Sequence, residues 1–301
     1  MAGSSVQAFM DTQDPFDALR PRLFGIAYRM LGIRADAEDV LQEAWLRWRT
    51  SDPQRVQSVQ AWLVTIVTRL AIDRLRAAKA EREAYVGGWL PEPIVQVDER
   101  TPEAVAELAS DLSVAFLHLL ERLGPEERAA YLLRQVFDYD YDEIAAMLGK
   151  REPAVRQLVH RAGERVRLER PRFEVAPETH RRLLERFMHA AQSGHRDALR
   201  ALLADGVASI GDGGGKVSAV AAGLRGRDRI ANLYWAHFLR LGDRLRYRIA
   251  TINGEPGLLR YLDGMLESAM SIESDGERIV AIYAVRNPDK LARIDAPLPP
   301  A

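Results

Sequence analysis

The sequence lacks cysteine altogether, so disulfide bonds and thiolate metal sites are excluded. Its apolar runs fall short of the roughly 18–20 residues that a membrane helix requires. The first residues, MAGSSVQAFMDTQDPFDALRPR, lack the basic and apolar segments of a secretory signal. Six scattered histidines show no metal-ligand spacing. We therefore expect a cytoplasmic protein with no membrane contact, no metal and no cofactor.

An excess of charge of either sign is also absent, since 42 Lys and Arg residues stand against 43 Asp and Glu residues. A net charge of −1 argues against a uniformly basic surface for nucleic acid. The charges are unevenly placed, however, because seven basic residues stand against three acidic ones from Lys150 to Arg170. A local patch of this kind matters more for binding phosphates than the total charge does.

The stretch GDGGGK, from Gly211 to Lys216, looks like a phosphate-binding loop. That motif requires a further glycine at the position of Ile210 and a hydroxyl residue where Val217 stands. Both requirements fail, and the third glycine of a dinucleotide-binding pattern would fall on Lys216. We interpret the run as a tight turn that needs positive φ angles, and an inter-domain contact or a pocket rim stays open beside the plain turn.

Residues from about 14 to 85 have helical periodicity in three segments, FDALRPRLFGIAYRML, ADAEDVLQEAWLRWRT and SVQAWLVTIVTRLAIDRLRAAKAERE. The periodicity stops in GGWLPEPIVQVDERTP, whose glycines and prolines are typical of a linker. Trp89 and Leu90 are too apolar for a fully solvated segment. We therefore expect part of this linker to dock on a domain.

A second helical block contains a helix–turn–helix pattern. A short helix from Asp142 to Leu148 ends at Gly149, and a longer helix begins near Pro153. Arginine, glutamine and histidine on the outer side of the longer helix suit base edges and phosphates. The outward residues are Arg151, Glu152, Arg156, Gln157, His160 and Arg161.

The character of the sequence changes after Arg170. Two amphipathic helices, THRRLLERFMHAAQSGH and RDALRALLA, precede glycine-punctuated segments that alternate like strands. Asp275-Gly276 stands between two apolar runs and predicts a hairpin turn. Helices followed by an antiparallel meander predict a small α+β cone.

The first helical block strongly resembles region two of an extracytoplasmic-function sigma factor, through DAEDVLQEAWLRW followed by AWLVTIVTRLAIDRLR. The helix–turn–helix resembles region four of that family, which implies readout of the minus-thirty-five promoter element and contact with the β flap of RNA polymerase. The resemblance implies that the first motif binds the β′ clamp of core polymerase through Asp36, Asp39, Gln42 and Glu43. It implies that the second motif recognises and melts the minus-ten element of promoter DNA. The matching residues there are Trp62, Arg69, Arg74, Arg76 and Lys79.

Three further motifs, WLPEP, DGGGK and NPDKL, look like the sigma subgroup that carries a C-terminal SnoaL-like domain. The resemblance implies a multi-domain chain, with two all-α sigma domains (a region two helical bundle and a region four helix–turn–helix) and a C-terminal α+β cone of the SnoaL/nuclear-transport-factor type that acts as a built-in regulator. The expected bounds are 1–87 for region two, 88–110 for the linker, 111–172 for region four and 176–301 for the cone. The expected inter-domain regulatory residues are Trp89, Leu90, Asp212, Lys216, Asn287, Asp289 and Lys290.

Other interpretations of these residues stay open. The spacing of Trp45, Trp48 and Trp62 is typical of core or subunit-contact residues as well as of base-stacking residues. The acids of the first motif could serve only as partners of the helix dipole. The whole chain could also be a DNA-binding regulator that is fused to a ligand-binding or catalytic cone domain. Its candidate acid–base residues are Asp212, His237, Asp263 and Glu267. They form no recognisable pair in the sequence, so we expect no catalysis.

Overall fold

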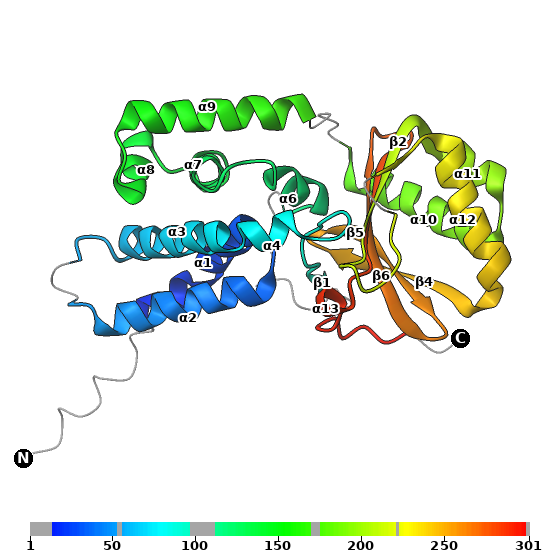
Figure 1. Ribbon diagram of the computed structural model, residues 1–301, viewed down its shortest axis with the longest axis horizontal. Helices are drawn as coiled ribbons and strands as arrows, with labels where there is room; N and C mark the ends of the chain where they lie inside the picture. Colours follow the sequence, from blue (N-terminus) through cyan, green and yellow to red (C-terminus); the bar gives the residue numbers. More distant parts are fainter. Residues whose placement is uncertain (1–13, 53–55, 97–111, 170–174, 221–222, 299–301) are drawn as a thin grey trace, which may run out of the picture.

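The computed structural model describes five ranges of the chain, residues 14–52, 56–96, 112–169, 175–220 and 223–298. The expectations for residues 1–13 and for the linker beyond residue 96 lie outside these ranges. Within them, two groups of helices lie beside a sheet that is covered by further helices (Figure 1). No helix in the described ranges is long and apolar enough to span a membrane.

The N-terminal helical group contains α1 (Pro15–Leu31), α2 (Arg34–Thr50), α3 (Val59–Ala77) and the short α4 (Lys79–Glu83). Local chemistry explains where these helices begin and end. The side chain of Asp14 caps α1 by accepting a hydrogen bond from the backbone N–H of Phe16 (2.9 Å). Gly32 ends α1 in the left-handed conformation, with φ of 69°. Ser58 caps α3 in the same way as Asp14 caps α1.

The second helical group contains α6 (Val114–Leu120), α7 (Pro125–Gln135), α8 (Tyr141–Leu148) and α9 (Glu152–Glu169). Gly149 ends α8 at φ of 63°, which lets the chain turn directly into α9. Ala145 of α8 and the α9 residues Val155 and Leu158 are buried in one apolar cluster. The predicted helix–turn–helix is therefore confirmed.

The two helical groups share a single apolar core, because α3 packs on α7 and α8 while α1 packs on α7. Arg128 of α7 is buried and donates to the backbone carbonyl of Met30 near the end of α1 (2.5 Å). Arg22 of α1 donates in return to the carbonyl of Phe137 (3.0 Å). A cation is favourable near the C-terminal carbonyls of a helix. The two groups thus form one packed unit.

The sheet domain contains α10 (Pro177–Ser193), α11 (Arg196–Leu202), α12 (Arg227–Leu241), the 3₁₀ turn η2 (Gly242–Arg244) and α13 (Pro288–Leu291). Its strands are β2 (Leu203–Asp212), β3 (Leu224–Arg225), β4 (Leu245–Ile252), β5 (Glu255–Leu262), β6 (Met265–Ser274) and β7 (Ile279–Val285). Together with β1 (Val95–Gln96) from the linker, the strand order is β1-β4-β5-β6-β7-β2-β3, and every pair except β2–β7 is antiparallel. Helices α10, α11 and α12 cover one face (Figure 1), which confirms the predicted α+β cone. Gly276 has a φ of 96° between the antiparallel strands β6 and β7, which confirms the predicted hairpin at Asp275-Gly276.

The opposite face of the sheet packs against the linker and the second helical group. Leu90 of the linker and Val114 of α6 lie in the same apolar cluster as Leu259 and Tyr283 of the sheet. The linker also forms β1 (Val95–Gln96), which pairs with β4 at the edge of the sheet. An added edge strand contributes main-chain hydrogen bonds to docking. The expectation that part of the linker docks is confirmed.

Candidate functional site

The outer face of α2 carries three of the four residues expected to bind core polymerase. Asp39, Gln42 and Glu43 are exposed there. The adjacent Trp45 and Leu46 are 39% and 47% exposed and add apolar surface to this face. A polar face with exposed apolar anchors suits docking on another protein. The sheet domain leaves this face open in the described part of the chain.

Asp36, the fourth of these residues, is arranged differently. Its side chain is 11% exposed and forms an ion pair with Arg74 (2.9 Å), one of the residues expected at the minus-ten element. The hydrogen bond to Asp36 raises the pKa of the Arg74 guanidinium above its usual value. The structure thus joins one residue of each expected site in a single pair that links α2 to α3.

Two other residues of the expected minus-ten site face the second helical group. The guanidinium of Arg69 donates to the backbone carbonyl of Met147 at the end of α8 (2.8 Å). Arg76 forms an ion pair with Glu126 in the first turn of α7 (2.8 Å). Both arginines therefore donate to the second helical group, and Arg76 also donates to Asp73 of its own helix (3.4 Å).

Trp62 and Lys79 complete the expected minus-ten set. Trp62 is half-buried, and its ring centre lies 5.9 Å from that of Trp48. This aromatic pair packs against the shared core. Lys79 is 75% exposed and lies 3.7 Å from Glu83. Lys79 is thus more accessible than Arg74 and Arg76, which are 44% and 55% exposed.

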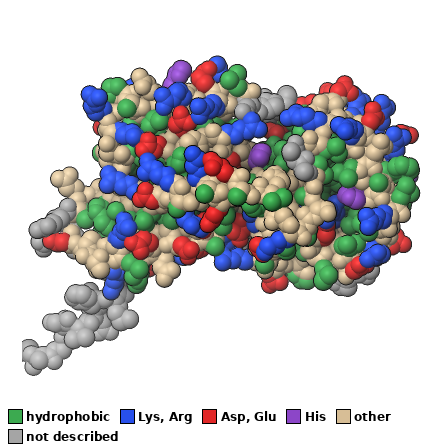
Figure 2. All heavy atoms as spheres, in the orientation of Figure 1, with side chains coloured by type: hydrophobic (Ala, Val, Ile, Leu, Met, Phe, Trp, Pro, Cys, Tyr) green, Lys and Arg blue, Asp and Glu red, His purple; other side chains and the backbone are tan. Residues whose placement is uncertain are grey.

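The expected minus-thirty-five residues lie along α9, with Arg151 directly before it, where Lys and Arg side chains are numerous on the molecular surface (Figure 2). Glu152 is half-buried and pairs with Arg156 (2.5 Å), whose guanidinium lies 4.1 Å from the ring centre of Tyr141. The exposed members are Arg151, Arg156, Gln157, His160 and Arg161. A basic face on the second helix of a helix–turn–helix suits the DNA backbone and base edges.

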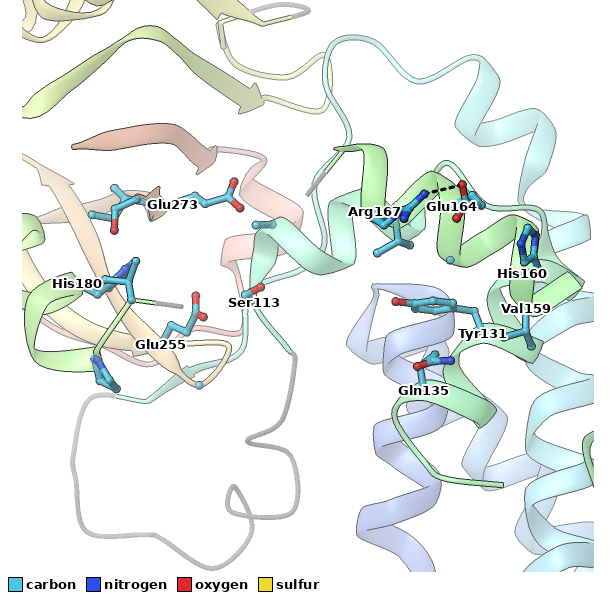
Figure 3. Close-up of a pocket in the computed structure, with 18 of the residues that line it drawn as sticks. Ser113, Tyr131, Gln135, Val159, His160, Glu164, Arg167, His180, Glu255 and Glu273 are labelled. Carbon is cyan, nitrogen blue, oxygen red and sulfur yellow. Dashed lines mark hydrogen bonds and ion pairs between the residues drawn. The ribbon is translucent and has the colours of Figure 1, made fainter. Parts of the chain in front are cut away.

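A cleft of about 1020 Å³ lies between α7, α9 and the sheet domain (Figure 3). Tyr131, Arg156 and His160 line its helical wall, while Glu255 and Glu273 line the sheet-domain wall. Two residues of the expected minus-thirty-five site therefore share a cleft with acidic residues of the sheet domain.

From here on the linker means residues 84–113, between the end of α4 at Glu83 and the start of α6 at Val114. Asp212 lies at the centre of a buried polar cluster between the linker and the sheet domain. Its carboxylate is fully buried and accepts hydrogen bonds from the Tyr85 hydroxyl (2.5 Å), the Leu90 backbone N–H (2.9 Å) and the Lys290 ammonium (2.8 Å). Lys290 also donates to the Leu90 carbonyl (2.5 Å) and lies 4.3 Å from the ring centre of Trp89. Burial lowers the pKa of Lys290, although Asp212 opposes the shift. We call Tyr85, Trp89, Leu90, Asp212 and Lys290 the linker lock.

The glycine run shapes the turn beside the linker lock. Gly214 and Gly215 follow β2 with φ of 61° and 71°, so the predicted turn is confirmed. A Cβ atom at Gly214 would overlap the amide of Asn287, which donates to the Tyr85 hydroxyl (2.9 Å). Glycine is therefore required for both the turn and this approach. Lys216, at the end of the glycine run, forms an exposed ion pair with Asp289 (2.7 Å).

Glu92 and Asn253 lie at the same interface, although no sequence pattern singles them out. They are 5% and 2% exposed, and a buried polar side chain requires hydrogen-bond partners. Asn253-Gly254 is a typical hairpin dipeptide, which predicts the β4–β5 turn but not its burial. Glu92 belongs to WLPEP, whose prolines predict only an extended linker.

The four candidate acid–base residues do not converge. Asp212 belongs to the linker lock, and Asp263 is exposed in a hairpin turn. Burial would raise the pKa of Glu267, but Arg260 and Arg286 hold it below its usual value. Burial, together with the same arginines, lowers the pKa of His237 to about 4. An acid–base catalyst needs a pKa near the working pH, and neither residue has one.

Two family models match the helical part of the chain. Sigma-70 region 2 matches residues 16–81, and Sigma-70, region 4 matches residues 113–166. The chain is 37% identical over 287 residues to the ECF RNA polymerase sigma factor SigJ of Mycobacterium tuberculosis, with 91% of each chain covered. It is 28% identical to the probable ECF RNA polymerase sigma factor SigI of that organism, covering 96% of this chain and 99% of the relative. The crystal structure of SigJ superposes with a TM-score of 0.76 and 33% identity, over 92% of this chain and 97% of that one.

Proposed function

We propose a regulatory role for the sheet domain, from the premise that this chain belongs to the extracytoplasmic-function (ECF) RNA polymerase sigma factors. As a member of that family it directs promoter-specific transcription initiation, with RNA polymerase core and promoter DNA as its partners. Helices α1–α4 form its region two and α6–α9 its region four. The SnoaL-like sheet domain is the additional part, and we place its action in the cytoplasm.

We infer that α2 docks on the β′ clamp of core polymerase. The exposure of Asp39, Gln42 and Glu43, beside Trp45 and Leu46, supports this assignment. Because this face is open while the sheet domain is docked, core binding does not require the sheet domain to move. Region four would reach the β flap in a later step, together with the minus-thirty-five element.

Promoter binding requires the two sigma domains to separate. The minus-ten and minus-thirty-five elements lie roughly 25 base pairs apart, which is roughly 85 Å along B-DNA. In this structure Arg69 and Arg76 instead contact Met147 and Glu126 of region four, both at 2.8 Å. The same donors cannot serve DNA phosphates at the same time. The structure thus corresponds to a closed form, and these two contacts are the observation that carries the proposal.

The linker lock opposes opening of this closed form. A fully extended chain spans about 3.3–3.6 Å per residue, so the linker from residue 84 to residue 113 can reach roughly 100 Å. If residues 85–96 stay on the sheet domain, the remainder reaches roughly 60 Å. The docked residues 85–96 cannot extend, which shortens the reach between region two and region four. Release of the linker lock therefore lengthens the reach that is available for promoter binding.

A reversible crosslink between the sigma domains tests the proposal. Gln60 of α3 donates to the Tyr139 hydroxyl (3.2 Å), so Gln60→Cys and Tyr139→Cys can be bridged by a short, cleavable thiol reagent. We expect the crosslinked protein to bind core polymerase but to fail in run-off transcription, and cleavage of the reagent to restore the transcript. Gln60→Cys alone, treated identically, is the control. Full transcription by the crosslinked protein would contradict the closed-form proposal.

We propose the cleft between α9 and the sheet domain as the place where a small ligand would act. Its volume of about 1020 Å³ is at the upper end for small-molecule sites, and both domains line it. An occupant would therefore change domain packing. Gly163 lines this cleft, and a Cβ atom there meets nothing within 4 Å. Gly163→Leu should abolish any metabolite-induced thermal shift seen in the unaltered protein; a shift that persists would place the ligand elsewhere.

A further inference from the structure

The turn between β4 and β5 is more deeply buried than a turn requires. Asn253 and Gly254 have φ of 52° and 83°, which is the geometry of a tight two-residue hairpin. Asp263 and Gly264 form the β5–β6 turn with nearly the same angles, 51° and 81°. Asp263 is exposed, whereas Asn253 is 2% exposed. Turn formation therefore explains the backbone at Asn253 but not the burial of its amide.

The side chain of Asn253 bonds three segments that are distant in the sequence. Its Nδ2 donates to the hydroxyl of Tyr28 in region two (2.9 Å) and to the carbonyl of Leu112, just before region four (3.0 Å). Its Oδ1 accepts from the backbone N–H of Ile94 in the linker (2.8 Å). An amide supplies two N–H donors and one acceptor oxygen, and each is used. Aspartate, which fits the same turn, lacks both donors.

The hydrogen bonds continue from Asn253 to the first turn of α2. The Tyr28 hydroxyl donates to the backbone carbonyl of Glu92 (2.6 Å). The Glu92 carboxylate accepts from the backbone N–H of Arg34, the first residue of α2 (2.9 Å). The preceding residue, Ile33, makes no side-chain cap there. A carboxylate from the linker thus accepts a hydrogen bond from a backbone N–H that has no partner within the helix, and it lies at the positive end of the helix dipole. The chain of contacts ends on the helix that we assign to polymerase binding.

We propose that Asn253 is a positioning residue that holds region two, the linker and the start of region four in register on the sheet domain, so that both sigma domains are released together. This inference rests on the proposed function. Asp212 differs, because its partners lie in the linker and in the sheet domain itself. Asn253 is therefore the point at which the movements of region two and region four become coupled.

Two pairs of fluorescent labels test this coupling in the full chain. The sequence has no cysteine, so labels can be introduced at exposed sites without background. Thr50→Cys with Leu239→Cys reports the distance from region two to the sheet domain. Leu168→Cys with Leu239→Cys reports the distance from region four to the same domain. Thr50 is exposed, and Leu168 and Leu239 are 79% and 61% exposed.

Asn253→Asp keeps the turn but sets an oxygen against the Leu112 carbonyl, so the open fraction should rise roughly tenfold or more in both label pairs. Asn253→Gly, which suits positive φ even better, should do the same if folding of the aspartate variant is impaired. Tyr28→Phe should loosen the region two pair alone, because it removes the hydroxyl's bonds to Asn253 and to the Glu92 carbonyl but leaves the bond from Asn253 to Leu112 in place. Asp263→Gly is the matched turn control and should change neither distance.

An Asn253 variant that changes one distance alone, or neither, overturns the inference. Run-off transcription separates this result from the proposed function. If both distances lengthen together while the transcript level stays unchanged, the positioning role stands and the regulatory proposal fails. Circular dichroism of each variant checks that the hairpin and the rest of the sheet domain remain folded.

Discussion

Replacing Asp212 by alanine should open the closed form by removing the acceptor on which the linker lock depends. Two hydrogen bonds cross from the linker to this carboxylate, one from the Tyr85 hydroxyl and one from the Leu90 N–H. The contact between Lys290 and the Leu90 carbonyl remains. The Asn287 bond to the Tyr85 hydroxyl remains as well, so Asp212→Ala weakens the attachment of the linker without abolishing it.

The structure sets the expected size of the effect. A hydrogen bond to a charged group contributes about 1.5–3 kcal/mol net, so two such bonds contribute at least about 3 kcal/mol. This corresponds to a rise of roughly 150-fold in the ratio of undocked to docked linker. Lys290, 7% exposed, also loses its carboxylate, and breaking a buried pair costs about 3–5 kcal/mol. That second cost falls on the stability of the sheet domain itself.

Energy transfer between labels at Thr50→Cys and Leu239→Cys measures opening, and thermal unfolding measures stability. Asp212→Asn with Lys290→Met removes both buried charges, so it should weaken docking with a smaller loss of sheet-domain stability than Asp212→Ala. Lys216→Ala is the control, because its ion pair with Asp289 is exposed and worth about 0–1 kcal/mol. Equal opening by Asp212→Ala and Lys216→Ala would refute the reasoning.

Three further outcomes are expected. Glu92→Ala should lower the free energy of unfolding by about 1 kcal/mol and weaken core binding in a pull-down, because α2 loses its cap, whereas Glu92→Gln should retain most of both. Glu126→Gln should free Arg76 and raise promoter affinity a few-fold in a mobility-shift assay, with core binding as the unaffected control. Lowering the pH from 7 to 5 should reduce the free energy of unfolding measured in urea, because His237, with its pKa lowered to about 4, takes up a proton only in the unfolded chain over this window. His237→Gln should flatten this slope, and an unchanged slope would assign it to other groups.

Local patterns in the sequence predict most of the fold. Gly149 and the short helix before it predict the helix–turn–helix, because glycine ends a helix at positive φ. Asp275-Gly276 predicts a hairpin for the same conformational reason, and the glycines after Asp212 predict a turn. Each of these features depends on a few neighbouring residues, which is the range over which a single sequence is informative.

Contacts between distant segments lie outside that range. Asn253 and Tyr28 are 225 residues apart, and the Asn-Gly dipeptide predicts a turn without its neighbours. Arg69 and Arg76 have the residue type expected for DNA phosphates, yet the structure pairs them with region four. An exposed arginine meets whichever acceptor tertiary packing brings near. Glu92 is similar, since its role as a cap becomes visible when the linker lies on α2.

The distance between region two and region four, before and after promoter binding, tests the central claim most directly. Labels at Thr50→Cys and Leu168→Cys, one on each sigma domain, report it by energy transfer. The closed form predicts efficient transfer in the free protein and in the presence of core polymerase alone. Addition of a promoter that supports run-off transcription should abolish the transfer as the domains move to elements roughly 85 Å apart. Efficient transfer that persists in the transcribing complex would contradict the account.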